Sequence, residues 1–139
     1  MTLQKGDRII IDNRTYSLFS NPLDYYWSED NPKPPMKWPT TSCLRGYVAK
    51  WEIIGNYLYL IDITFRALDG DAGLDYVFPN TPGKIRAEWY SGELRIPLGD
   101  PIIRDDYTYP DYTYIITDID WFIRVDKGRI IGHRYKANY

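Results

Sequence analysis

A two-residue alternation of side chains is the strongest structural signal in this sequence, and it is clearest between Arg45 and Ala67. Before the turn-forming pair Gly55-Asn56, every second position is filled by Tyr47, Ala49, Trp51 and Ile53. After the pair, the same spacing places on one face Tyr57, Tyr59, Ile61, Ile63 and Phe65. Successive side chains of a strand point to opposite faces of a sheet, so the pattern predicts two long paired strands.

Two other segments are typical of hairpins. Between Arg8 and Phe19, two runs of strand-forming residues flank Asp12-Asn13-Arg14, which tolerate turn dihedral angles. Between Ile85 and Leu98, a shorter alternation turns at Ser91-Gly92. Proline has no backbone N–H to donate, so we expect Pro97 to mark a sheet edge or the end of a strand.

The C-terminal part repeats the alternation. Tyr112 to Val125 reads as a long strand, and Asp126-Lys127-Gly128 forms a turn into a last strand from Arg129 to Tyr135. The alternation predicts that three residues of this last strand share one face, namely Ile131, His133 and Tyr135.

These patterns predict one all-β domain over residues 1–139. No segment repeats apolar residues at helical spacing, and the 17% aromatic share suits pleated, half-buried surfaces. A chain of 139 residues is also too short for two sizeable cores. We expect a mainly antiparallel, curled sheet of about eight strands, barrel-like or sandwich-like, with long loops and little helix. Closing or stacking such a sheet would protect its edges.

Long connections rich in aromatic and acidic residues interrupt the strands. Five prolines between Ser20 and Ser42 stop strands and helices from running far, so we expect either an ordered loop or a short helix at Pro22–Ser28 followed by extended chain. A second such connection covers Gly99–Asp111. Tyrosine and tryptophan are enriched at protein interfaces. The predicted binding residues are Tyr25, Tyr26, Trp27, Trp38, Asp105, Asp106, Tyr107 and Tyr109. The alternative is that these aromatic rings fold back over the core as a lid.

The acidic connection from Leu68 to Lys84 resembles a calcium loop only in part. Asp69, Asp71 and Asp75 have the spacing of alternating cation ligands. The sixth position, however, is Leu74 instead of the glycine needed for a sharp turn, and the twelfth is Asn80 instead of glutamate. We expect a solvated connector with no metal and no cofactor.

The sequence contains no recognisable catalytic motif. His133 is the only histidine and Cys43 the only cysteine, and Ser91 lacks the preceding glycine of a nucleophile elbow. Two carboxylate pairs, Asp105/Asp106 and Asp118/Asp120, could act as acid and base on a glycosidic bond. We expect a non-enzyme, and a glycosidase-like activity using loop carboxylates is kept as an alternative.

Charge and cysteine content limit the partners and the compartment. The net charge is −2 and the pI about 5.3, without a block of Lys and Arg that would bind nucleic acid. One cysteine cannot form an intramolecular disulfide. With charges at Lys5, Asp7 and Arg8 and no apolar run of membrane-spanning length, we expect no membrane association and a cytoplasmic location.

Three blocks of the sequence carry a resemblance. They are RGYVAKWEI at 45–53 followed by LYL at 58–60, WYSGELRIPLG at 89–99, and YSLFSNPL at 16–23. Through them the chain resembles, over most of its length, a group of small bacterial proteins of unknown function. The resemblance implies no reaction, cofactor or catalytic residue. Small acidic bacterial domains of this kind are often protective partners of toxins, which is an analogy at the level of class.

The functional hypothesis is a non-enzymatic protein-binding module. Its acidic, aromatic connections would suit a basic surface on a protein partner, as in an immunity or inhibitor protein that covers a toxin. The alternative from another class is a β-domain that binds carbohydrate or a small ligand on its aromatic rings.

Overall fold

The computed structural model describes residues 6–38, 43, 45–67, 70–81, 83–102 and 116–137, with the side chains of all of these except 99–102 and 116–118. In chain order the elements are β1 (Asp7–Ile11), β2 (Arg14–Leu18), the 3₁₀ helix η1 (Pro22–Tyr25), β3 (Tyr47–Ile54), β4 (Tyr57–Ala67), β5 (Gly70–Ala72), α1 (Leu74–Val77), β6 (Ile85–Arg86), β7 (Gly92–Ile102), β8 (Ile116–Asp126) and β9 (Arg129–Ala137).

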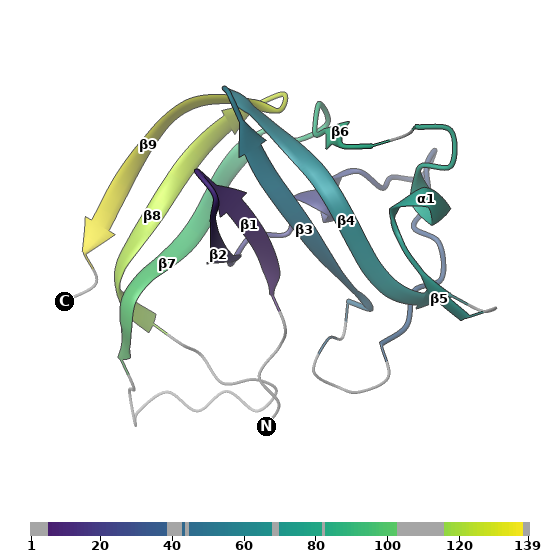
Figure 1. Cartoon of the computed structure of the whole chain (residues 1–139), viewed down its shortest axis with the longest axis horizontal. Helices are drawn as coiled ribbons and strands as arrows, with labels where there is room; N and C mark the ends of the chain where they lie inside the picture. Colours follow the sequence, from purple (N-terminus) through teal and green to yellow (C-terminus); the bar gives the residue numbers. More distant parts are fainter. Residues whose placement is uncertain are drawn as a thin grey trace.

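The nine strands of the described segments form one mixed sheet in the order β2-β1-β3-β4-β9-β8-β7, with β5 and β6 paired to β4 off this path (Figure 1). All pairs are antiparallel except β1 with β3. The predicted all-β fold with little helix is therefore confirmed. The sheet curls until the Phe19 N–H, just after β2, donates to the Arg95 carbonyl of β7 at 2.8 Å. The described strands β2 and β7 form no ladder, so the sheet is curled but not closed.

Local turn chemistry explains two of the hairpins. Asp12 and Asn13 between β1 and β2 have φ angles of 51° and 66°, and Lys127 and Gly128 between β8 and β9 have φ angles of 48° and 82°. Two successive left-handed residues form the turn whose twist matches that of paired strands. Both hairpins were predicted from the sequence, and both are confirmed.

A β-bulge changes the predicted faces of β4. Lys50 pairs with Asp62 but Trp51 pairs with Leu60, so Ile61 is an extra residue in β4. The side chains after the bulge consequently change face, and the buried residues of β4 include Leu58, Leu60, Ile63 and Phe65. The prediction that Ile63 and Phe65 share a face with Tyr57 and Tyr59 is therefore wrong, because strict alternation does not continue through a bulge.

The predicted hairpin between Ile85 and Leu98 is also wrong. Ile85 of β6 pairs with Leu60 of β4, and β7 pairs with β8. The chain bends between them, where the Tyr90 N–H donates to the Ala87 carbonyl at 3.1 Å. Pro97 lies in β7, the last strand of the sheet order, as expected of an edge proline.

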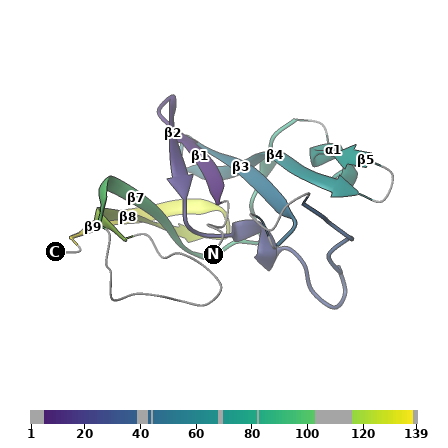
Figure 2. The same ribbon diagram turned by 90° about the horizontal axis from the view of Figure 1, so that it is seen from below.

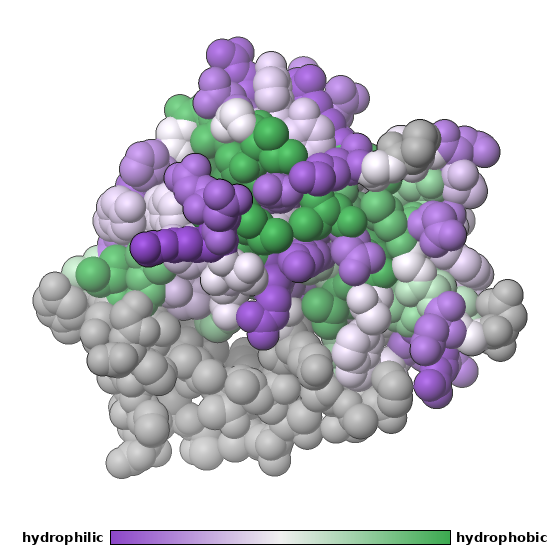
Figure 3. All heavy atoms as spheres, viewed as in Figure 1, coloured by the Kyte–Doolittle hydropathy of each residue, from purple (hydrophilic) through white to green (hydrophobic). Residues whose placement is uncertain are grey.

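The core lies on the inner face of the curled sheet. Its fully buried members come from elements far apart in sequence and include Ile9, Leu18, Leu23, Tyr47, Trp51, Leu58, Leu60, Leu94 and Ile96. On the outer face, apolar areas gather over the central strands and are divided by hydrophilic ones (Figure 3). No helix in the described segments is long and apolar enough to span a membrane.

The sheet splits between β4 and β9. These strands pair only at Tyr57 and Arg129, and they diverge from this point (Figure 1). Seen from below, β7, β8 and β9 lie at the end of the sheet opposite β5 and α1 (Figure 2). Residues 131–137 of β9 consequently have no strand partner on the side away from β8 among the described residues. Because the sheet is not closed, the edge protection expected from closing or stacking it is not reached at β9 in the described segments.

Candidate functional site

The predicted binding residues of the first connection do not have equal access to solvent. Tyr25 ends the helix η1, and its side chain is 69% exposed. Tyr26, Trp27 and Trp38 are each half-buried. The other four predicted binding residues lie outside the described residues: Asp105, Asp106, Tyr107 and Tyr109.

Tyr26 and Trp27 pack against the core. The Tyr26 ring lies 5.0 Å from that of Phe78 and 4.8 Å from that of Trp89. The Trp27 ring meets Tyr47 edge-on at 5.5 Å. These two side chains thus act as the lid that sequence analysis kept as an alternative, and Tyr25 is left facing outward.

Polar contacts fix the helix η1 in place. The Trp89 Nε1–H donates to the Pro22 carbonyl at 2.9 Å, and the Tyr47 hydroxyl donates to Asp24 Oδ1. Burial, and then the Asp24 carboxylate, raise the pKa of Tyr47 above its usual 10, so the hydroxyl keeps its proton at neutral pH. Leu23 of the same helix is fully buried.

A closed turn follows at Ser28–Asn31. The Ser28 N–H donates to the Asn31 carbonyl at 2.9 Å, and the Asn31 N–H donates to the Ser28 carbonyl at 3.2 Å. Asn31 Nδ2 also donates to the Tyr26 carbonyl at 3.1 Å. Glu29 and Asp30 lie at the tip of this turn, and both are exposed. Neither carboxylate forms an ion pair with another described residue. We call residues 21–31 the aromatic–acidic loop.

A buried carboxylate lies beneath the aromatic–acidic loop. Asp7 is 1% exposed, and it accepts hydrogen bonds from the Ala49 N–H at 3.0 Å and from Trp51 Nε1 at 3.0 Å. Arg45 donates to the same carboxylate and also to Asn21 Oδ1, at the start of the loop. Arg45 therefore joins the core to the aromatic–acidic loop.

Sequence analysis missed this buried network. It treated Asp7 only as one of the charges that argue against membrane association. The sequence does contain one signal, because Asp7 comes directly before a strand-forming run. A carboxylate that is buried at the start of a strand needs hydrogen-bond donors from elsewhere in the chain.

Burial raises the pKa of Asp7 above its usual 3.8. The Arg45 guanidinium and the hydrogen bonds from Trp51 and Ala49 act in the opposite direction and offset part of this increase.

Asp7 should make the free energy of unfolding fall as pH rises. Because its pKa is higher in the folded chain than in the unfolded chain, its stabilising contribution is fully present below 3.8 and is lost as pH rises through the folded-state pKa. We expect urea denaturation from about pH 3 to pH 8 to show this fall in the wild type relative to Asp7→Asn, which cannot titrate. A wild-type advantage that grows with increasing pH would contradict the prediction.

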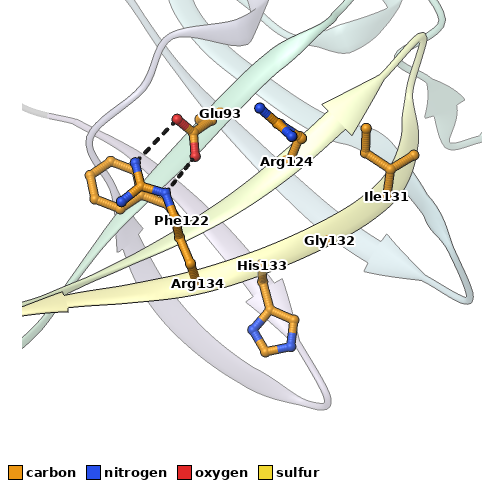
Figure 4. A pocket seen from close by; sticks show the side chains of 7 residues that line it. All are labelled: Glu93, Phe122, Arg124, Ile131, Gly132, His133 and Arg134. Carbon is orange, nitrogen blue, oxygen red and sulfur yellow. Dashed lines mark hydrogen bonds and ion pairs between the residues drawn. The ribbon is translucent and has the colours of Figure 1, made fainter.

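A second concave region lies on the outer face of β7, β8 and β9 (Figure 4). It is a pocket of about 380 Å³ lined in part by Glu93, Phe122, Arg124, Gly132 and Arg134. The Arg134 guanidinium bonds both Glu93 carboxylate oxygens, at 3.2 and 3.3 Å, and lies 4.4 Å from the centre of the Phe122 ring. Arg124 forms no ion pair with a described residue, so the pocket has an excess of positive charge.

The residues considered for catalysis are engaged separately. Cys43 is buried, and its thiol donates to the Tyr47 carbonyl at 3.0 Å. His133 is exposed on β9, where Nδ1 accepts from Trp121 Nε1 at 3.2 Å. Cys43 and His133 are therefore engaged with different partners.

Two of the carboxylates singled out in the sequence pair with arginines. Asp120 is buried and pairs with Arg95 at 3.1 Å, while the side chain of Asp118 lies outside the described ones. In the acidic connection, Asp71 Oδ1 lies 3.6 Å from Arg66 Nε. Asp69 lies outside the described residues.

Both regions present charged or aromatic side chains to solvent. The aromatic–acidic loop presents Tyr25, Glu29 and Asp30 from a fixed backbone, and the pocket presents Arg124 beside the Glu93–Arg134 pair. Comparison of the chain with protein-family models, with curated proteins and with solved structures finds no match.

Proposed function

We propose that this chain is a protein-binding module whose aromatic–acidic loop contacts a basic surface on its partner. The observation that carries the proposal is the presentation of Glu29 and Asp30, without ion pairs to described residues, at the tip of a closed turn that follows exposed Tyr25. Carboxylates that have no internal partner are available to cations on another molecule.

The anchoring of the loop supports this role. Ordering a flexible loop on binding costs free energy, and this cost is reduced when the loop is already fixed. Here Trp89, Tyr47 and Arg45 hold residues of the loop by hydrogen bonds, and Tyr26 and Trp27 pack below it. Tyr25 can then supply a large, rigid contact area with a polar tip.

Small size and acidic balance favour an immunity-type or inhibitor-type protein that covers a toxin. The resemblance to a group of small bacterial proteins stays a prediction and assigns no partner. Binding of saccharides by the same loop is less favoured, because Tyr26 and Trp27 turn their rings to Phe78, Trp89 and Tyr47 instead of forming an open platform.

The proposal predicts that Tyr25→Ala weakens partner binding by about 2 kcal/mol, as expected of an interface anchor. The partner is captured from a bacterial lysate, identified, purified and titrated by calorimetry. Ile54→Ala is a control, because this side chain is 40% exposed and lies at the end of β3, outside the loop. Circular dichroism of each variant shows whether the fold is kept.

The same titration tests the charge of the partner. Glu29→Gln with Asp30→Asn should slow association and reduce its salt dependence, since exposed charges act mainly on the association rate. If the Tyr25 and charge variants bind like the wild type with the fold intact, the proposal is wrong. Saturable binding of saccharides that Tyr25→Ala abolishes would favour the carbohydrate alternative.

A further inference from the structure

The free edge of β9 is a second region able to bind another chain. Along residues 131–137, the backbone groups that face away from β8 have no hydrogen-bond partner among the described residues. Such an edge is a template for another strand. Proteins commonly block edges with proline, and β7, at the end of the sheet order, contains Pro97 and Pro101. The free part of β9 contains none.

The outer side of this edge favours negative charge. Gly132 pairs with Arg124, and Arg134 pairs with Phe122, so both arginines flank the pocket next to the edge (Figure 4). Arg134 is held by Glu93 and by the Phe122 ring, whereas Arg124 has no ion pair with a described residue. A Cβ atom built on Gly132 would meet nothing within 4 Å, so there is room for an incoming side chain beside it.

The inner side of the same edge is aromatic. His133 points away from Arg124 and Glu93, to the opposite side of the sheet (Figure 4). On that side the Tyr135 ring stacks on Trp121 with centroids 5.9 Å apart and planes at 12°. His133 lies edge-on to both rings, at 6.1 and 5.9 Å. With Tyr135 60% exposed, this surface can accept apolar side chains.

We propose that the free edge of β9 binds an extended segment of a protein partner in which acidic and apolar residues alternate. Main-chain hydrogen bonds would add the segment to the sheet as a strand, and pockets for alternate side chains would select it. Its acidic residues lie on the outer side by Arg124 and Arg134. Its apolar residues lie on the inner side by His133 and Tyr135.

Charge disfavours a second copy of this chain as the occupant. Antiparallel pairing of two β9 edges would bring the outer-side cations Arg134 and Arg124 of one chain close to those of the other, and Lys136 adds to this charge. Like charges that face each other across strands are destabilising. With an acidic strand in the same place, each of these repulsions between like charges becomes an attraction between opposite charges. The proposal does not depend on the aromatic–acidic loop.

The test uses the full chain and a fluorescent peptide of about seven residues, the length of the free edge, with Glu and Val alternating and one Tyr replacing a Val. One control peptide has the same composition with the Glu residues grouped together. Another has Lys in place of Glu. We expect saturable anisotropy for the alternating Glu peptide, and binding about tenfold weaker or absent for both controls.

Variants and mapping locate the binding. Arg124→Glu changes an exposed residue without a described ion pair, so the fold should be kept, and the variant should prefer the Lys peptide over the Glu peptide. Arg8→Glu is a matched control, because Arg8 is also exposed and lies on β1, and this variant should bind like the wild type. Amide hydrogen exchange should slow along residues 131–137 on addition of the Glu peptide.

Each of the following outcomes would overturn the proposal. Equal binding of alternating and grouped peptides would exclude strand addition. An unchanged peptide preference in Arg124→Glu, or protection outside β9, would place the site elsewhere. A wild-type dimer in sedimentation experiments with protection at residues 131–137 would identify a second copy as the occupant. No binding of the Glu peptide at millimolar concentration would also exclude the proposed partner class.

Discussion

Replacing Asp7 with alanine is expected to lower the free energy of unfolding by about 3–5 kcal/mol, the cost of removing one partner of a buried ion pair. The substitution leaves the Trp51 Nε1–H and the Ala49 N–H, both bonded to Asp7 at 3.0 Å, without their acceptor. It also leaves the guanidinium of Arg45 without its carboxylate. Urea denaturation at neutral pH measures the loss.

Two further variants separate the buried network from a general effect of removing aspartate. Asp30→Ala removes an exposed carboxylate without a described ion pair and should change stability by less than about 0.5 kcal/mol. Asp7→Ala combined with Arg45→Met should cost less than Asp7→Ala alone, because no unpaired charge is left. If Asp7→Ala and Asp30→Ala were equally stable, the buried network would contribute nothing to the fold.

Replacing Gly46 with alanine is expected to lower the free energy of unfolding by about 3 kcal/mol, through a left-handed backbone and a steric overlap together. Gly46 has a φ angle of 88°, and a Cβ atom there would lie 2.4 Å from the Met36 carbonyl oxygen. Because the overlap is with backbone, the loop around Met36 would have to move. Thermal or urea denaturation measures the effect.

Gly55 provides the matched control for this substitution. It has a φ angle of 60°, and a Cβ atom there would meet nothing within 4 Å. Gly55→Ala should therefore cost about 1 kcal/mol, from the backbone alone. A loss at Gly46 no larger than that at Gly55 would mean that the close approach to Met36 does not constrain the chain.

Local chemistry made the hairpins predictable. The Asp12-Asn13 and Lys127-Gly128 turns adopt left-handed dihedral angles. Asp12, Asn13 and Gly128 are of the residue types that tolerate these angles. The bulge at Ile61 and the pairing of β6 with β4 have no comparable local signal. Both depend on which strands become neighbours, and this is decided by packing between residues far apart in the chain.

The sequence was enough to predict which types of residue form the candidate site, but not which of their side chains are exposed to solvent. Tyr25, Tyr26 and Trp27 are adjacent and chemically similar, yet only Tyr25 faces outward. The difference arises from the positions of Phe78, Trp89 and Tyr47, which no local pattern reveals. For the same reason the Asp7–Arg45 pair, which spans 38 residues, was not foreseen.

The free edge of β9 depends on topology in the same way. Alternation predicted a strand from Arg129 to Tyr135, but it could not show that β4 would pair with only the first residue of that strand. The prediction that Ile131 shares a face with His133 is wrong, because Val125 pairs with Ile130 and Arg124 with Gly132, which makes Ile131 an extra residue.

The parallel pairing of β1 with β3 has a consequence for the order of folding. Arg8, Ile9 and Ile10 pair with Lys50, Trp51 and Glu52, so this ladder forms only after a segment of about 40 residues has closed into a loop. In the meander β7–β8–β9, each strand pairs with the next strand in the chain, so no such long loop has to close. During synthesis the β1–β2 hairpin must therefore wait, with Ile9 and Leu18 uncovered, until β3 has been made, and we expect its docking to be the slow step of folding.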